Sequence, residues 1–162
     1  MSQRSNCHKC RKLLVDPIGS PSADYLIAGE FPEFEELRSG KPMVGKVGDI
    51  LTSELAIAGL SVGRFRITNL WLHAVNEKEC DPAWHLDQLS KELKGKKAAL
   101  LMGSELSKAL FQRSILELSG LEMKHAAFPK LRMFFSPSPA ALFHGPVGEM
   151  RLAMHRFAAA VR

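Results

Sequence analysis

Two cysteines near the start of the chain, Cys7 and Cys10, form a C-x-x-C pair, and a third cysteine, Cys80, stands alone. An odd number of cysteines in a chain whose N-terminal stretch shows no apolar signal-peptide core argues against a disulfide framework. A C-x-x-C pair in this setting is typical of a metal site. The sequence therefore predicts metal binding near the N-terminus.

A second group of chemically capable residues begins at Gly29-Glu30-Phe31-Pro32 and continues through Gly40-Lys41-Pro42-Met43-Val44-Gly45 to Gly48. A strand that ends in Gly-Glu places a carboxylate at the edge of a sheet. Glycines in the following loop let the backbone approach a ligand or a phosphate closely. Taken alone, the same pattern also fits a surface loop with a solvated acidic patch.

Short apolar runs bounded by Gly, Pro or polar residues predict four buried strands. These are Asp24–Ala28, Phe65–Asn69, Lys97–Met102 and Leu131–Phe135. The stretches between and after them have helical spacing. These are Val47–Ala58, Ala83–Leu93, Ser104–Gln112 and Val147–Val161. The alternation predicts an α/β fold, a three-layer α/β/α sandwich around a central four-stranded parallel sheet.

Ligands of such sheets bind outside the carboxyl ends of the strands. The sequence places Gly29–Glu30, Asn69–Leu72, Gly103–Ser104 and Ser136–Ser138 there. We therefore expect Glu30 and Asn69 to lie at one edge of the sheet.

Composition restricts the class of protein. A chain of 162 residues, 46% hydrophobic and 24% charged, fits one globular domain over residues 1–162, with a metal-binding segment at about 1–20. No apolar run is long enough to cross a bilayer, so we expect no membrane contacts and a cytoplasmic location. We also expect a monomer. The net charge of +5 favours an anionic partner, above all a nucleic acid.

The stretch GEFPEFEELRSGKPMVGKVG resembles, without a gap, the first motif of family 4 uracil-DNA glycosylases, roughly G-E-x-P-G-x-x-E-D-x-x-G-R-P-F-V-G-x-x-G. Three later segments resemble further family motifs in the family's order: Ile67-Thr68-Asn69 its I-T-N, Met102-Gly103 with Ala109-Leu110 its L-G…A-L, and Ser136-Pro137-Ser138-Pro139 its H-P-S. The resemblance covers nearly the whole chain. It implies a monofunctional enzyme that flips a pyrimidine nucleotide out of DNA and hydrolyses its N-glycosidic bond.

The resemblance also implies roles for individual residues. Glu30 matches the carboxylate that places or activates the hydrolytic water, where it can also stabilise oxocarbenium character on the sugar. Asn69 matches the asparagine that reads the polar edge of the base, since an amide offers both a donor and an acceptor. The other residues expected in contact with substrate are Gly29, Phe31, Pro32, Met43 and Ser138.

Three positions depart from the family pattern. Met43 stands where the family has the Phe that stacks on uracil, and such stacking contributes about 1–3 kcal/mol. Ser136, a third candidate catalytic residue, replaces a histidine that donates to the base carbonyl, and Glu33 replaces a glycine. We therefore expect a 5-modified pyrimidine, such as glucosylated hydroxymethylcytosine in phage DNA, as substrate. The alternatives are uracil excision in repair and a catalytically inactive DNA-binding protein on the same scaffold.

Family 4 enzymes hold a [4Fe–4S] cluster with four cysteines, and Cys7 and Cys10 match the first pair. His73 stands at the third position, and Cys80 follows it. Cys7, Cys10, His73 and Cys80 would make a three-cysteine, one-histidine set, an arrangement common in structural zinc sites. Because the cysteine spacing of the cluster is broken, we expect zinc, with the iron–sulfur cluster as alternative. His8 and His85 are alternative ligands, and three buried thiols without metal is the remaining possibility.

Binding to DNA requires groups that contact phosphates. Lys41 and Lys46 flank the first loop, Ser104 begins a helix whose N-terminus can take a phosphate, and Ser138 matches the residue that grips the flipped nucleotide. The segment after Ser138 carries an apolar wedge in the superfamily, so Leu142 or Phe143 is expected to fill the gap left by the flipped base.

Overall fold

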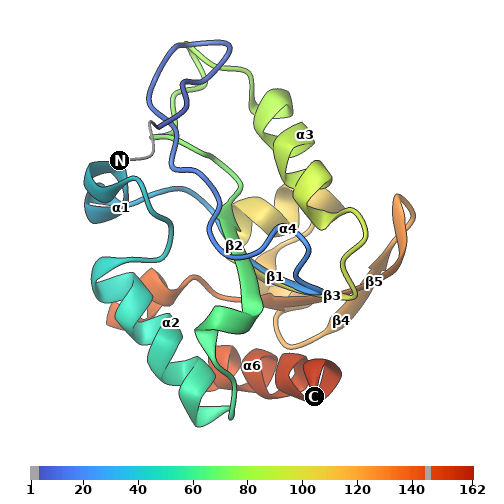
Figure 1. Cartoon of the computed structure of the whole chain (residues 1–162). Coiled ribbons are helices and arrows are strands. Elements are labelled where there is room, and N and C mark those ends of the chain that lie inside the picture. Colours follow the sequence, from blue (N-terminus) through green and yellow to red (C-terminus); the bar gives the residue numbers. More distant parts are fainter. Residues whose placement is uncertain (1–3, 145–146) are drawn as a thin grey trace.

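The apolar runs form one central sheet of five strands, in the order β2-β1-β3-β5-β4 (Figure 1). The computed structural model describes residues 4–144 and 147–162, with the side chains of Leu142 and Phe143 outside the description. The strands are β1 (Tyr25–Gly29), β2 (Phe65–Asn69), β3 (Ala98–Met102), β4 (Glu122–His125) and β5 (Phe128–Ser136). β1, β2, β3 and β5 are parallel, and β4 pairs antiparallel with β5.

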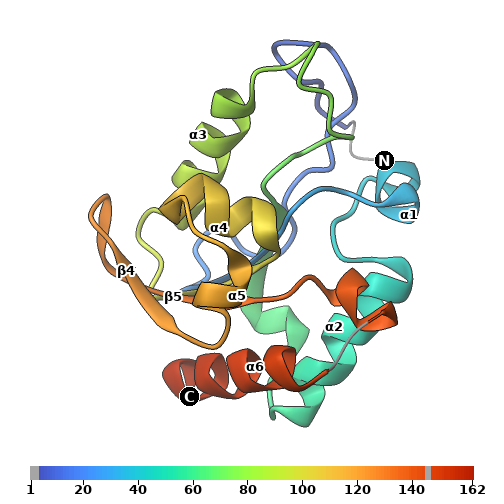
Figure 2. The ribbon, with the colours of Figure 1, turned by 180° about the vertical axis from the view of Figure 1, so that it is seen from behind.

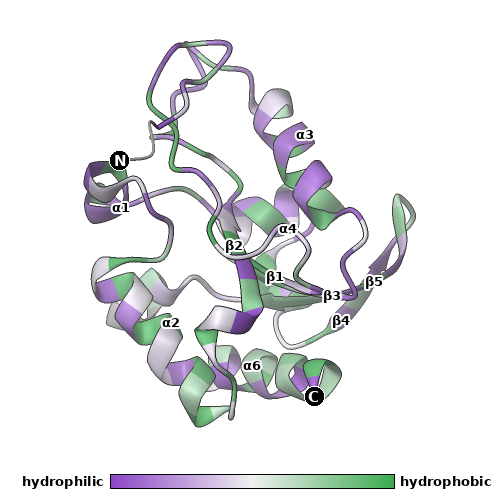
Figure 3. Ribbon diagram, in the orientation of Figure 1, coloured by the Kyte–Doolittle hydropathy of each residue, from purple (hydrophilic) through white to green (hydrophobic). Residues whose placement is uncertain are grey.

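Helices cover both faces of this sheet (Figure 2). On one face lie α3 (Pro82–Leu93), α4 (Ser104–Phe111) and α5 (Ile115–Leu118), and on the other α2 (Gly45–Ile57) and α6 (Gly148–Val161). Alternate residues of a strand serve opposite faces: Leu26 and Ala28 pack into the first core, and Ile27 packs into the second. Apolar colouring accordingly concentrates in the central strands (Figure 3).

The remaining elements are short. α1 (Phe34–Ser39) follows β1, the 3-10 turn Val62–Arg64 precedes β2, and the 3-10 turn Pro139–Phe143 follows β5. None of the helices in the described part of the chain is long and apolar enough to cross a membrane.

The structure confirms the predicted α/β class and corrects the predicted sheet. The expected four parallel strands are present, within three residues at each end, but β4 adds an antiparallel fifth at the edge. Only one face of β4 is partly covered, so its sequence, EMKH, lacks the apolar run that marks the buried strands. Its partner β5 begins at Phe128 rather than Leu131 because pairing with β4 extends the ladder.

The N-terminal segment runs along the open edge of β2. Ile18 exchanges backbone hydrogen bonds with Ile67, and the Val15 amide donates to the Leu72 carbonyl at 2.6 Å. Residues 7–10 thereby come to lie beside the loop that follows β2, where the two segments form the tip of the molecule (Figure 1).

Candidate active site and metal centre

Glu30 and Asn69 are neighbours at the carboxyl edge of the sheet. Gly29, the last residue of β1, pairs in register with Asn69, the last residue of β2. Beyond the strands, the Leu70 amide donates to the Gly29 carbonyl and the Trp71 amide to the Glu30 carbonyl, both at 2.8 Å. Continued pairing of the two backbones holds the carboxylate and the amide side by side.

Both side chains line one cavity of about 210 Å³ at this edge. One water needs only about 10–15 Å³ of such space, so the cavity can hold a group as large as a pyrimidine ring. Its lining comes from the end of β1, the first loop (residues 30–44, which include α1), the first turn of α2, the end of β2 and the 3-10 turn after β5. The residues are Gly29, Glu30, Phe31, Glu33, Glu36, Met43, Val47, Asn69, Ser138, Pro139, Ala140 and Ala141.

The Glu30 carboxylate lies against the N-terminus of α4. A Cβ added to Gly103 would stand 1.7 Å from Glu30 Oε1, so residue 103 must be glycine for the carboxylate to sit there. Burial raises the pKa of Glu30 above its ordinary value, whereas hydrogen bonding from the Ser104 amide opposes the rise. The result is a partly desolvated carboxylate, held by helix amides and open to the cavity.

Asn69 is buried and held by a third residue of the cavity, Glu36. Asn69 Nδ2 donates to Glu36 Oε1 at 3.4 Å. Backbone amides also donate to this carboxylate, that of Met43 to Oε1 at 2.5 Å and that of Glu33 to Oε2 at 2.7 Å. Because an ionised carboxylate only accepts, these contacts fix the Asn69 amide with Nδ2 toward Glu36.

Burial raises the pKa of Glu36, and the Glu33 and Met43 amides and Asn69 oppose that rise. Sequence reasoning missed Glu36 as a site residue because it stands in a run of acidic residues that reads as a solvated helix face. The sequence did hold one signal, because Glu36 aligns with the second glutamate of the family motif G-E-x-P-G-x-x-E-D. Its side chain is only 1% exposed, which identifies it as structural support for the cavity.

Met43 lines the same cavity. Its Cε and Asn69 Oδ1 stand 2.4 and 2.6 Å from where a Cβ on Gly29 would be, so any side chain at Gly29 would displace both. Met43 itself has φ of 53°, a left-handed conformation unusual for a residue with a side chain. The first loop is therefore folded tightly around Gly29 and Asn69.

The other predicted substrate contacts are spread around the cavity. Phe31, which is 38% exposed, and Ser138 line it, and Pro32 lines an adjoining hollow that shares Glu30 and Phe31. Ser136 is fully buried, and its hydroxyl donates to the Pro137 carbonyl at 2.9 Å. A catalytic part for Ser136 stays a prediction.

The predicted DNA contacts lie around the same edge. Lys41 is exposed on the first loop, and Lys46 is exposed in the first turn of α2. Ser138 caps the 3-10 turn that follows it by accepting from the Ala140 amide. At the α4 N-terminus, the Ser104 amide faces the Glu30 carboxylate. Leu142 and Phe143 belong to the turn Pro139–Phe143, but their side chains lie outside the described residues.

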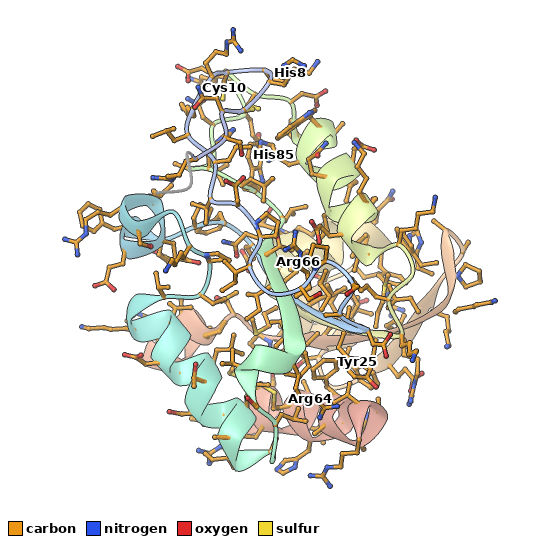
Figure 4. All side chains as sticks on the ribbon, viewed as in Figure 1. His8, Cys10, Tyr25, Arg64, Arg66 and His85 are labelled. Atoms are coloured by element: carbon orange, nitrogen blue, oxygen red, sulfur yellow. The ribbon has the colours of Figure 1, made fainter. Side chains whose placement is uncertain are left out.

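The four predicted metal ligands come together at the tip of the molecule. One ligand atom from each of Cys7, Cys10, His73 and Cys80 lies within 4.8 Å of all the others. Cys7 Sγ is 3.6 Å from Cys80 Sγ, and Cys10 Sγ is 3.3 Å from His73 Nε2. In Figure 4, Cys10 lies in the N-terminal loop, with His8 pointing outward nearby and His85 further in.

Hydrogen bonding prepares these groups for a metal. His73 Nδ1 is 2.8 Å from the Ala74 carbonyl, which only accepts, so Nδ1 carries the proton and Nε2 presents a lone pair to the thiols. Burial opposes ionisation of Cys7, yet the Cys10 and Lys9 amides lower its pKa overall. Burial raises the pKa of Cys80 to about 12, and a cation would offset that cost of forming the thiolate. The donor set therefore fits a thiophilic metal.

His85 lies directly beside this group. Its Nε2 is 3.4 Å from Cys80 Sγ and 3.1 Å from His73 Nε2. Its side chain is fully buried, and burial and the nearby His73 lower its pKa to about 4, so the imidazole is neutral. Of the two alternative histidines named from the sequence, His85 is thus at the centre, whereas His8 is exposed.

The profile of the Uracil DNA glycosylase superfamily matches residues 17–160. The chain is 37% identical over 70 residues to a type-4 uracil-DNA glycosylase of Pyrobaculum aerophilum, a match covering 40% of this chain and 36% of that protein. It is 34% identical over 68 residues to one of Archaeoglobus fulgidus, covering 42% and 34%. The matches span about a third of the length of these curated relatives. With most of its length matched, the chain belongs to the uracil DNA glycosylase superfamily.

Proposed function

We propose that the protein is a monofunctional DNA glycosylase, which flips a pyrimidine nucleotide into the cavity and hydrolyses its N-glycosidic bond to leave an abasic site. The observation that carries this proposal is the convergence of Glu30 and Asn69 on one cavity of about 210 Å³. Membership of the superfamily supports the same reaction.

In the proposed reaction, Glu30 orients a water toward C1′ of the sugar and stabilises the oxocarbenium character that develops there. Asn69 binds the polar edge of the base, with Glu36 holding its amide in one orientation. Ser138 and the exposed Lys41 and Lys46 contact the phosphates of the flipped strand. Leu142 or Phe143 fills the space left in the DNA.

We propose a 5-modified pyrimidine, such as glucosylated hydroxymethylcytosine in phage DNA, as the substrate. Met43 in place of a stacking Phe supports this choice, because a flexible thioether leaves more freedom beside the ring than a fixed aromatic face. Two hollows of about 470 and 480 Å³ adjoin the base cavity and share lining residues with it, so a bulky substituent has somewhere to go.

Uracil excision is the second candidate, favoured by the similarity of the chain to two type-4 uracil-DNA glycosylases. The two readings are separated by incubating the protein with matched oligonucleotides that carry uracil, hydroxymethylcytosine or glucosylated hydroxymethylcytosine at one position. Abasic sites should form fastest at the glucosylated base. Faster cleavage at uracil would refute the modified-base proposal and leave the glycosylase intact.

The same assay addresses the third possibility, an inactive DNA-binding protein. Glu30→Ala should abolish abasic-site formation while the variant still binds the oligonucleotide. Glu149→Gln, which alters an exposed carboxylate at the start of α6, serves as the matched control and should keep full activity. Wild-type protein that binds DNA but forms no abasic site on any of the substrates would establish the inactive binder.

We further propose that the tip of the molecule holds a single zinc ion. A Zn–S bond of about 2.3 Å places the sulfurs of a tetrahedral site about 3.8 Å apart, close to the 3.6 Å between Cys7 and Cys80. A four-iron cluster puts each ligand on a different iron, which requires a wider ligand cage than one within 4.8 Å. Elemental analysis should find one zinc per chain, and a brown protein containing iron and sulfide would refute the assignment.

A further inference from the structure

A fifth side chain, that of His85, reaches the metal centre from α3 without belonging to the four-ligand group. We propose that His85 is a positioning residue of this centre, which donates a hydrogen bond from Nε2 to the Cys80 thiolate. The inference rests on the proposed metal site and is independent of the proposed reaction on DNA.

A hydrogen bond from the Leu72 backbone amide shows which ring nitrogen of His85 carries the proton. The Leu72 amide donates to His85 Nδ1 at 3.3 Å. An amide cannot accept, so Nδ1 supplies the lone pair and the proton of the neutral ring sits on Nε2. A metal bond to Nε2 would then require either loss of that proton to give an imidazolate, or transfer of the proton to Nδ1 with loss of the Leu72 hydrogen bond, so His85 is not an ordinary ligand in this arrangement.

His73 has the opposite tautomer. Its Nδ1 donates to the Ala74 carbonyl at 2.8 Å, which leaves a lone pair on Nε2. The two imidazoles therefore meet as donor and acceptor, with their Nε2 atoms 3.1 Å apart. Once an ion takes the His73 lone pair, the His85 N–H has one remaining partner in this group, Cys80 Sγ at 3.4 Å.

Cys80 has particular need of such a donor. Cys7 receives hydrogen bonds from the Cys10 and Lys9 amides within its own turn. Within residues 4–144 and 147–162, the hydrogen-bonding neighbours of Cys80 Sγ are two thiols and His85, so the imidazole is its only nitrogen donor. A single N–H group thus both orients this sulfur and disperses its charge.

The ring of His85 is held in place from two sides. Its centroid lies 4.4 Å from that of Trp71 and 4.8 Å from that of Trp84. These are the only tryptophans of the chain, so intrinsic tryptophan fluorescence reports on the surroundings of His85. Ring packing and the Leu72 hydrogen bond together leave His85 no freedom to turn another atom to the centre.

The test compares His85→Phe, which keeps a ring but removes the N–H, with His85→Gln, which keeps a donor. Zinc affinity is measured by competition with a chelating dye. Cobalt(II) substitution shows the ligand set through its sulfur-to-metal absorption. His85→Phe should bind zinc about 10–100-fold more weakly than the wild type. The absorption spectrum of its cobalt(II) form should equal that of the wild type, because the four ligands are unchanged. His85→Gln should recover part of the affinity, and the exposed His8→Gln should change nothing.

Wild-type affinity in a folded His85→Phe variant would overturn the proposal. So would loss of a nitrogen ligand from the cobalt spectrum, which would make His85 a ligand in place of His73. Circular dichroism of the zinc-saturated variants establishes whether they are folded. If His85→Phe does not fold, the zinc affinity of His85→Gln is compared with that of the wild type instead, and an affinity equal to that of the wild type would then count against the proposal. Tryptophan emission should shift on zinc binding in the wild type. A wild-type protein that binds no metal would refute the site and the role of His85 together.

Discussion

At the scale of single residues, the site is built on one buried carboxylate. Glu36 accepts from two backbone amides of the first loop and from the amide of Asn69, so one side chain ties the loop to the end of β2. A buried acceptor that satisfies three donors cannot be removed without leaving all three unpaired. The orientation of the Asn69 amide thus depends on Glu36.

Glu36→Ala should therefore destabilise the protein by about 1–3 kcal/mol and lower activity together with base discrimination, because the Asn69 amide becomes free to turn. Thermal unfolding and the ratio of rates on two substrate bases measure the two effects. Glu149→Ala is the matched surface control. Unchanged stability in the Glu36 variant would show that the buried contacts are not as described.

The pH dependence belongs to the residue scale as well. The pKa values of Glu30 and Glu36 are raised above 4.5 by burial. A raised carboxyl pKa contributes stability below pH 4.5 that is lost as pH rises through the folded value. If ionised Glu30 acts in catalysis, activity should rise with pH through that same raised value.

Glu30→Gln should therefore raise the melting temperature at neutral pH by a few degrees while eliminating the pH-dependent activity. Melting curves and rate profiles between pH 4 and 8 give both quantities. A lower melting temperature for Glu30→Gln at neutral pH would mean that the ionised carboxylate stabilises the fold, against the direction of its pKa shift.

At the scale of elements, the ends of β1 and β2 position Glu30 and Asn69, and the N-terminus of α4 lies against the Glu30 carboxylate. α4 begins at Ser104 directly after Gly103, whose missing side chain makes room for Glu30. Gly103 has φ of 116°, a conformation that strains any residue with a side chain. Helix start and carboxylate position are therefore determined by the same residue.

Gly103→Ala should displace Glu30 and reduce activity strongly. Gly95→Ala provides the matched control, because Gly95 also has positive φ, 81°, but a Cβ there meets nothing within 4 Å. Both variants should lose about 1–3 kcal/mol of stability because of backbone strain. Only Gly103→Ala should also lose much more activity than this loss of stability explains. Equal losses of activity in the two variants would argue against close packing of Glu30 on α4.

The same elements show where sequence reasoning succeeds. Runs such as Ala98–Met102 are buried on both faces, so nearly every residue is apolar and the strand is evident. β4 alternates exposed and half-buried residues over only four positions, too short a pattern to distinguish from a loop. Glu36 could not be assigned to the cavity because its role depends on a contact with Asn69, 33 positions away in the chain. The sequence names His85 only as an alternative ligand, because its contact with the Leu72 amide, 13 positions away, is not visible in the sequence.

At the scale of the whole molecule, the metal centre joins segments that are far apart in sequence. Cys10 and His73 are 63 residues apart, and the centre lies at the tip formed by the N-terminal segment and the loop after β2 (Figure 1). Trp71 packs on His85, and its amide donates to the Glu30 carbonyl. The candidate metal centre and the sheet edge that carries Glu30 therefore share one loop.

Removing the metal with a chelator should destabilise the protein by about 2–4 kcal/mol, as expected for the loss of a cross-link that closes a loop of this length. Hydrogen exchange should increase first in residues 4–20 and 70–80. The exposed His8→Gln variant should respond as the wild type does. Unchanged melting and exchange after verified metal loss would show that the centre has no structural part.

In the proposed reaction, Glu30 and Asn69 act together on a flipped base. Its most direct test is single-turnover release of free base, identified by mass spectrometry, from DNA carrying one glucosylated hydroxymethylcytosine, with wild-type protein and the Glu30→Gln and Asn69→Ala variants. Joint action of the two residues predicts one base released per abasic site by the wild type, with both variants at least about 100-fold slower at saturating protein. Wild-type rates in either variant would contradict it.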